Sequence, residues 1–163
     1  MHNDQNRSRQ NVVVRRAEFD DWQTIAQFNQ ALAAETESKF LPDELIVPGV
    51  QKVFSDPAKG QYFVACHDSL VVGQMMITFE WSDWRNGWFW WIQSVYVRQE
   101  WRRQGIFKQI FQYVEQLAHE QGDVVGLRLY VEKENLVAQT TYGALKMFDS
   151  GYYMFEKKLQ SKE

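Results

Sequence analysis

The spacing of hydrophobic residues changes along the chain, and each change marks a different element. Residues 11–16 (NVVVRR) form an apolar run that is typical of a strand. Residues 43–54 (DELIVPGVQKVF) predict a short helix that Pro48 and Gly49 break or kink. Between these two segments, residues 20–35 predict a longer helix with Asp20 as its N-cap, because four apolar side chains recur at near-helical spacing: Trp22, Ile25, Phe28 and Leu32.

The middle of the chain adopts the two-residue period of β-structure. Residues 61–67 and 70–81 predict two strands joined by a turn at Asp68 and Ser69. Residues 88–97 predict a third strand after the turn signal Asn86-Gly87. Short turns between consecutive strands imply an antiparallel meander.

The last third of the chain alternates between the two periods. A helical stripe starts after Gly105 and predicts a central helix through Ile106, Ile110, Phe111, Val114, Leu117 and Ala118. Residues 126–132 then predict a strand, residues 135–145 a helix that Asn135 opens, and residues 150–159 a closing strand. The expected order is β-α-α-β-β-β-α-β-α-β, a mixed α/β fold of the α+β type. Because no repeat or linker divides the chain, we expect one domain over residues 11–160 behind a disordered tail of residues 1–10.

Composition narrows the functional classes. The 163 residues are 45% hydrophobic, which is enough for a sizeable core. The formal net charge of −3 argues against a general nucleic-acid binder. Cys66 is the only cysteine, so the sequence predicts no disulfide and no cysteine-pair metal site, which fits a cytoplasmic protein. The three scattered histidines indicate no metal site, and the sequence predicts neither a signal peptide nor a membrane span.

The loop before the central helix concentrates positive charge around a glycine. The amides at a helix N-terminus lack intrahelical partners and attract anions, so Arg102, Arg103 and Lys108 beside Gly105 predict a phosphate site. The alternative is a solvated loop with surface arginines. Neither the P-loop nor the dinucleotide-binding glycine motif occurs in the sequence.

Two segments resemble motifs of the GNAT family of N-acetyltransferases. The segment VYVRQEWRRQGIF is similar to the family's acyl-CoA-binding motif at Arg102 and Gly105, although Phe107 stands where a small residue is usual. The segment ENLVAQTTYGALKMF is similar to the later motif at its opening Asn, small residue and Tyr. Lys146 replaces the glycine that usually ends that motif.

The resemblance implies a fold, a cofactor and a set of site residues. The fold is a central mixed, mostly antiparallel sheet of about six to seven strands flanked by about four helices, and the cofactor is acetyl-CoA. The strand edge at Val95, Tyr96 and Val97 would bind the pantetheine arm. The diphosphate would lie at Arg102, Arg103, Gln104, Gly105, Ile106, Phe107 and Lys108, and Asn135, Ala138 and Tyr142 would flank the arm. In the reaction, the Val95 amide would stabilise the oxyanion and Tyr142 would protonate the thiolate.

The general base is less well defined by the sequence. Many family members carry a carboxylate near the position where this chain has Gln93 and Ser94, and neither side chain can take a proton from an ammonium. Glu80 is the preferred candidate, because it ends the third strand beside an aromatic cluster. The other carboxylates that could act through water are Glu35, Glu37 and Asp83. A solvated strand end is the alternative interpretation of Glu80.

Five of the seven tryptophans lie in the hairpin EWSDWRNGWFWWIQ. Alternation places Trp88, Trp90 and Ile92 on one face of the strand and Phe89, Trp91 and Gln93 on the other. One face belongs to the core, and the other either lines an amine pocket or covers a contact in a homodimer. The predicted substrate-binding residues are Glu35, Glu80, Trp81, Asp83, Trp84 and Gln93.

The sequence is compatible with three functions. The first is transfer of an acetyl group from acetyl-CoA to the primary amine of a small molecule in a ternary complex, as in the diamine and aminoalkyl branch that the hairpin resembles. The second is acetylation of a protein or peptide. The third is a non-catalytic acyl-CoA-binding module, which the missing carboxylate would suit.

Overall fold

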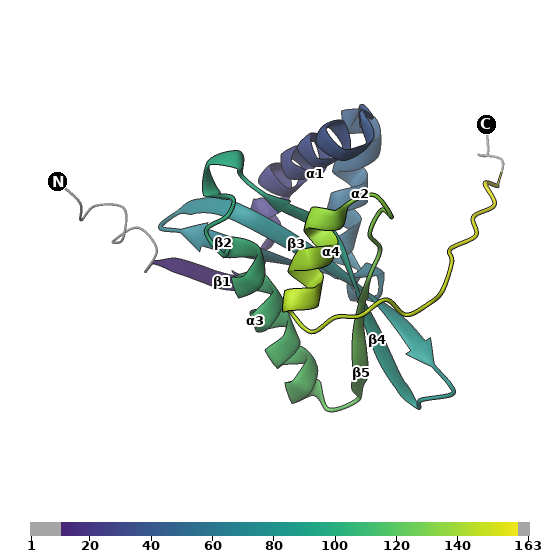
Figure 1. Cartoon of the computed structure of the whole chain (residues 1–163). Helices are drawn as coiled ribbons and strands as arrows, with labels where there is room; N and C mark the ends of the chain where they lie inside the picture. Colours follow the sequence, from purple (N-terminus) through teal and green to yellow (C-terminus); the bar gives the residue numbers. More distant parts are fainter. Residues whose placement is uncertain (1–10, 160–163) are drawn as a thin grey trace. The chain divides into compact units, whose positions relative to one another are not determined.

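The computed structural model describes residues 11–159 (Figure 1). The predicted tail at residues 1–10 lies outside this range. The described residues form two compact units, one that ends at Tyr130 and one that starts at Val131. The first unit contains the sheet and three α-helices, and the second contains one α-helix.

The first unit is built on a five-stranded sheet in the order β1-β2-β3-β4-β5. The first four strands are antiparallel and form the predicted meander, whereas β5 runs parallel to β4. The order of the elements confirms the sequence prediction up to the last strand. The elements are β1 (Val12–Arg16), α1 (Trp22–Glu37), α2 (Asp43–Ser55), β2 (Gln61–His67), β3 (Leu70–Ser82), β4 (Gly87–Val97), α3 (Ile106–Gln121) and β5 (Val124–Leu129) in the first unit, and α4 (Leu136–Ala144) in the second.

Helices cover both faces of this sheet (Figure 1). On one face, Ile25 and Phe28 of α1 and Val50 of α2 pack in one cluster with Tyr62 and Val64 of β2. On the other face, α3 packs against residues that include Phe63 of β2 and Gly73 of β3. The Phe63 ring packs edge-on against Tyr113, and a Cβ on Gly73 would lie 2.9 Å from Cγ2 of Ile106. The glycine therefore lets α3 approach the sheet closely.

The prediction that Pro48 and Gly49 interrupt the second helix is wrong. The helix runs unbroken from Asp43 to Ser55 with Pro48 inside it. Pro48 is the sixth of the thirteen helical residues and removes one intrahelical donor, the amide that would bond to the Glu44 carbonyl. Val50 is almost fully buried against α1 and β2, and this packing holds the helix together.

The predicted closing strand at residues 150–159 is also wrong, so the described sheet has five strands rather than six or seven. The segment is exposed throughout and has no strand partner among the described residues. The backbone groups of an isolated extended segment form hydrogen bonds with water instead of with a neighbouring strand. Alternating aromatic residues such as Tyr153 and Phe155 do not make up for the missing strand pairing.

Arg15 and Asp21 tie β1 to the turn before α1. Arg15 Nη1 lies 2.7 Å from Asp21 Oδ2, and the Glu18 amide donates to the same oxygen. Burial alone would raise the pKa of Asp21, but these hydrogen bonds and the Arg15 charge outweigh it and lower the pKa.

Asp21→Asn should therefore lower the free energy of unfolding at pH 7 by about 1–2 kcal/mol. Because the folded pKa of Asp21 lies below the unfolded one, its stabilisation is present above the unfolded pKa and is lost as pH falls through the folded pKa. Urea unfolding from pH 7 to pH 2 should show the two proteins converging in acid. A constant difference across that range would contradict the assignment.

Candidate active site

The α3 N-terminus is open to a ligand. Gly105 precedes the helix with φ 81° and ψ 12°, a left-handed conformation, and no side chain caps the helix. A Cβ at Gly105 would meet no atom within 4 Å. The first amides of α3 lack intrahelical acceptors, so they can donate to an anion that occupies this space.

The strand that leads to this loop is bulged. Met76 pairs with Gln93 and Gln74 pairs with Tyr96, so two residues of β4, Ser94 and Val95, lie opposite one residue of β3. Ser94 has φ 50°, which is unusual for a residue other than glycine. This bulge was not predicted from the sequence.

Beyond the bulge, β4 has a free edge. In the part of the chain that the structure describes, the pairing of β4 with β5 ends at Ile92 and Leu129. The edge from Gln93 to Val97 that would continue this pairing has no strand partner within residues 11–159. It therefore presents backbone donors and acceptors that an amide-bearing ligand can satisfy.

Two buried amide side chains, Gln74 and Asn29, lie between the β4 bulge and α1. Gln74 of β3 is fully buried, and its Nε2 donates to Asn29 Oδ1 at 2.7 Å and to the Ser94 carbonyl at 3.1 Å. Asn29 of α1 in turn donates to the Tyr62 hydroxyl at 3.4 Å. Neither amide was among the site residues predicted from the sequence. A signal was present, because Gln74 is the only polar residue in the run VVGQMMI and Asn29 lies on the apolar face of its helix.

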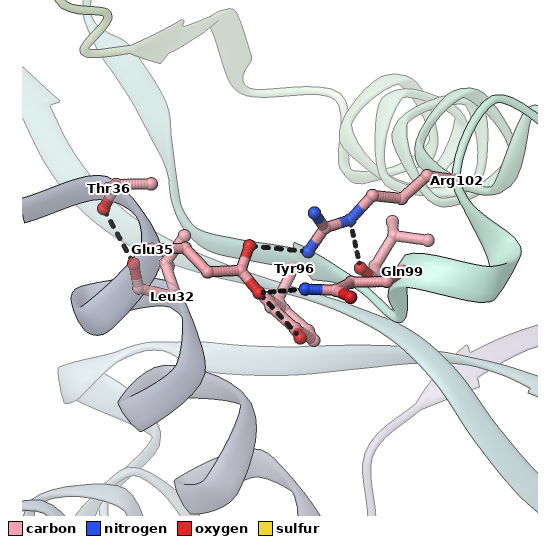
Figure 2. Close-up of polar contacts among 7 residues, drawn as sticks. Leu32, Glu35, Thr36, Tyr96, Gln99 and Arg102 are labelled. Carbon is pink, nitrogen blue, oxygen red and sulfur yellow. Dashed lines mark hydrogen bonds and ion pairs between the residues drawn. The ribbon is translucent and has the colours of Figure 1, made fainter.

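Arg102 contacts α1 and the end of β4. Its Nη2 lies 2.7 Å from Oε2 of Glu35, and its Nε donates to the Val97 carbonyl at 2.9 Å. Figure 2 shows the Glu35 carboxylate reaching from α1 towards Arg102, Gln99 and the Tyr96 hydroxyl. Burial would raise the pKa of Glu35, but the hydrogen bonds and the charge of Arg102 lower it overall. The structure thus brings one predicted substrate residue to the predicted cofactor loop.

Glu80 lies in a polar and aromatic cluster on the sheet. Its carboxylate accepts a hydrogen bond from Trp91 Nε1 and lies 3.2 Å from Arg128 Nη1. The Arg128 guanidinium stacks 3.4 Å from the ring centre of Phe89, and Tyr130 stacks on Trp91. An ion pair and ring contacts order this cluster, and the Glu80 side chain is 44% exposed.

The other predicted substrate residues lie at several places. Gln93 shares the face of Glu80 and donates to Thr78 Oγ1 at 2.7 Å. Trp81 lies on the opposite face, where it packs edge-on against Trp88. Asp83 and Trp84 belong to the turn of the hairpin, and Trp84 is 89% exposed. The structure therefore groups only Glu80 and Gln93 on one face, and the alternation predicted for β4 is confirmed.

The second unit positions its predicted residues on α4. The Asn135 side chain caps this helix by accepting from the Ala138 amide at 3.0 Å, as the sequence predicted for the opening residue. Tyr142 lies in the last turns of the same helix, and burial raises the pKa of its phenol. The hydroxyl therefore stays protonated at neutral pH.

The geometry of the first unit fits a coenzyme A molecule. An anion site at an uncapped helix start suits a diphosphate, and the free strand edge suits an arm that carries two amides. The Phe107 ring packs 6.1 Å from that of Phe111, one turn further along α3. The described residues contain no group of three or more His, Cys, Asp or Glu side chains that could hold a metal ion.

Comparison with known families identifies this arrangement. Residues 18–146 match the profile of the acetyltransferase (GNAT) family. The chain belongs to this family. A possible acetyltransferase from Clostridium difficile 630 is 46% identical in sequence and has a TM-score of 0.87, with 93% of this chain and 100% of that chain covered. These matches support an N-acetyltransferase rather than a non-catalytic module.

More distant GNAT structures share the fold. An aminoglycoside acetyltransferase from an uncultured soil metagenomic sample, solved with sisomicin, is 19% identical over 91% of this chain and 97% of that chain, with a TM-score of 0.76. Ribosomal-protein-alanine N-acetyltransferase from Brucella melitensis biovar Abortus 2308 is 15% identical over 91% and 99%, with a TM-score of 0.73. Comparison with curated protein sequences gives no match. None of the helices within residues 11–159 combines the length and hydrophobicity of a membrane span.

Proposed function

We propose that this GNAT protein transfers an acetyl group from acetyl-CoA to the primary amine of a small molecule by direct attack in a ternary complex. The main support for the proposal is the order in which three structural features follow one another along residues 93–108. A bulged strand with a free edge leads into a loop of arginines and then into an uncapped helix start. Each feature matches one part of coenzyme A.

In this proposal, the diphosphate is held by the amides from Arg103 to Lys108 and by the charges of the loop. Arg102 already has an anionic partner in Glu35. A diphosphate at the helix start would compete with that carboxylate or share the guanidinium with it. The backbone of Val95, Tyr96 and Val97 binds the arm. Asn135, Ala138 and Tyr142, which the family resemblance assigns to the cofactor, lie on α4 of the second unit.

The chemistry needs a neutral amine, a stabilised oxyanion and a protonated leaving group. Acetyl-CoA supplies the thioester. The amine nitrogen bonds to its carbonyl carbon to form the oxyanion, and the C–S bond breaks when that oxyanion collapses. The Val95 amide donates to the oxyanion, and Tyr142 gives its proton to the departing thiolate. Glu80 accepts the proton that the amine loses, through water, and both residues then exchange protons with solvent.

The small-amine acceptor is supported by the cluster around Glu80. The Glu80 carboxylate beside the indole of Trp91 suits a cationic amine, which would compete there with the Arg128 guanidinium that already pairs with Glu80. A structural neighbour is an aminoglycoside acetyltransferase solved with sisomicin. A protein acceptor is the second candidate, because another neighbour is a ribosomal-protein-alanine N-acetyltransferase of similar TM-score. The homodimer suggested by the exposed hairpin remains part of the proposal, as does a cytoplasmic location.

An acceptor screen tests the proposal. Thiol release from acetyl-CoA should rise when diamines or aminoglycosides are added to the wild-type protein, and it should stay at the background rate with a matched panel of peptides that have free N-termini. Thiol release with peptides but not with small amines would show that the protein acetylates proteins or peptides instead. Coenzyme A binding without turnover on any acceptor would contradict the proposed reaction.

A further inference from the structure

Gln74 is a polar residue in a place that packing alone would give to an apolar one. It is fully buried in the middle of β3, between the α1 layer and the bulge of β4. Its Nε2 uses both hydrogens, one on Asn29 Oδ1 and one on the Ser94 carbonyl. Its Oε1 is buried and has no hydrogen-bond partner among residues 11–159.

This arrangement is costly for stability. A buried acceptor without a partner lowers stability. A methionine of similar length would fill the same space without this unpaired oxygen, although it would leave Asn29 Oδ1 and the Ser94 carbonyl without their donor. The contact that sets Gln74 apart is the one to Ser94, because it fixes a backbone carbonyl at the point where β4 leaves regular pairing with β3.

The Ser94 carbonyl and the Val95 amide belong to one peptide group. In a planar trans peptide the C=O and N–H bonds point in opposite directions. Gln74 therefore fixes the direction of the Val95 N–H by holding the oxygen on the other side of the plane. Ser94 has φ 50°, a conformation that needs support from its surroundings.

We propose that Gln74 is a positioning residue for acetyl transfer, which aims the Val95 amide at the developing oxyanion through the Ser94 carbonyl. The inference rests on the proposed function, in which the Val95 amide stabilises that charge. Asn29 supports the same alignment, because its Oδ1 holds the second Nε2 hydrogen at 2.7 Å while its own Nδ2 donates to Tyr62. The amide of Gln74 is thus oriented from α1 and β2 together.

The first test is Gln74→Met. An oxyanion donor that is misdirected stabilises the transition state less and affects the bound thioester little, so kcat should fall at least about tenfold while KM for acetyl-CoA changes less than about twofold. The melting temperature should fall somewhat, because Asn29 Oδ1 and the Ser94 carbonyl lose their donor, so kcat is measured well below that temperature. Met75→Leu is the control, since Met75 is equally buried on the same strand and points to the other face.

The second test uses Gln74→Glu and keeps the side-chain length. A protonated carboxyl can donate to the Ser94 carbonyl and an ionised one cannot. The ratio of kcat for this variant to kcat for the wild type should therefore rise as pH falls. This ratio gives an answer even if Gln74→Met folds poorly.

The outcomes separate the two proposals. A wild-type protein that transfers acetyl groups, with Gln74→Met at full kcat or with a pH-independent ratio for Gln74→Glu, overturns the positioning role alone. A wild-type protein without transfer to any amine or peptide overturns the proposed function, and the positioning role with it. A selective loss of kcat, absent in Met75→Leu, supports the inference.

Discussion

Tyr142→Phe should lower kcat by about 10²–10⁴-fold and leave the affinity for coenzyme A within a few-fold of wild type. The magnitude is that of a general acid in acyl transfer. A phenol has an ordinary pKa of about 10, and burial raises it further in Tyr142. The wild-type hydroxyl is therefore protonated throughout the neutral range and can donate to the thiolate. Steady-state thiol release measures kcat, and calorimetry measures the affinity.

The pH dependence of the same variant sharpens this prediction. Only the protonated phenol can donate a proton. The contribution of Tyr142 to kcat of the wild type should therefore be constant up to the ordinary pKa of a phenol, about 10, and should decline only above it. That alkaline decline should be missing from the residual activity of Tyr142→Phe. Tyr152→Phe is the control, since Tyr152 is an exposed tyrosine of the same unit. Equal kcat for Tyr142→Phe and wild type would remove Tyr142 from the mechanism.

Gly105→Asp should weaken coenzyme A binding by roughly 100-fold without unfolding the protein. Space is available, because a Cβ at this position meets no atom within 4 Å. The added carboxylate lies where the diphosphate is proposed to bind, and two like charges about 5 Å apart repel by roughly 3 kcal/mol at an effective dielectric constant of 20. Asp tolerates the left-handed conformation better than most residues, so the helix should form.

Gly105→Asn is the matched control for this charge. Its side chain has the same shape and accepts the same backbone conformation, but it carries no charge. The binding loss for Asn should be much smaller than for Asp, and the difference should shrink at high ionic strength. Equal losses would show that the cause is backbone strain rather than repulsion at an anion site.

Much of the first unit could be predicted from local sequence signals. The turns at Asp68 and Asn86 and the apolar stripe of α3 placed the meander and the central helix close to their observed bounds. The errors arose where tertiary contacts decide the outcome. Pro48 is tolerated because Val50 and its neighbours pack α2 against α1, and a propensity argument does not include this packing.

In the candidate site too, features set by local sequence could be predicted and features set by tertiary contacts could not. The uncapped helix at Gly105 and the cap at Asn135 follow from spacing along one segment, and both were predictable. The bulge at Ser94 was not, since it depends on the register between β3 and β4. The Glu35–Arg102 pair and the Gln74–Asn29 contact join residues that are far apart in the chain. Gln74 and Asn29 each stand out as polar residues among apolar ones, but a single sequence does not show which residues form a pair.

Titration of coenzyme A into the folded wild-type protein tests the central claim most directly, because every proposed role depends on the β4 edge and the α3 amides holding this molecule. Calorimetry should show saturable binding of one coenzyme A per chain, weakened by roughly 100-fold in Gly105→Asp. No heat of binding at millimolar coenzyme A, from protein whose folding is confirmed by circular dichroism, would contradict the account.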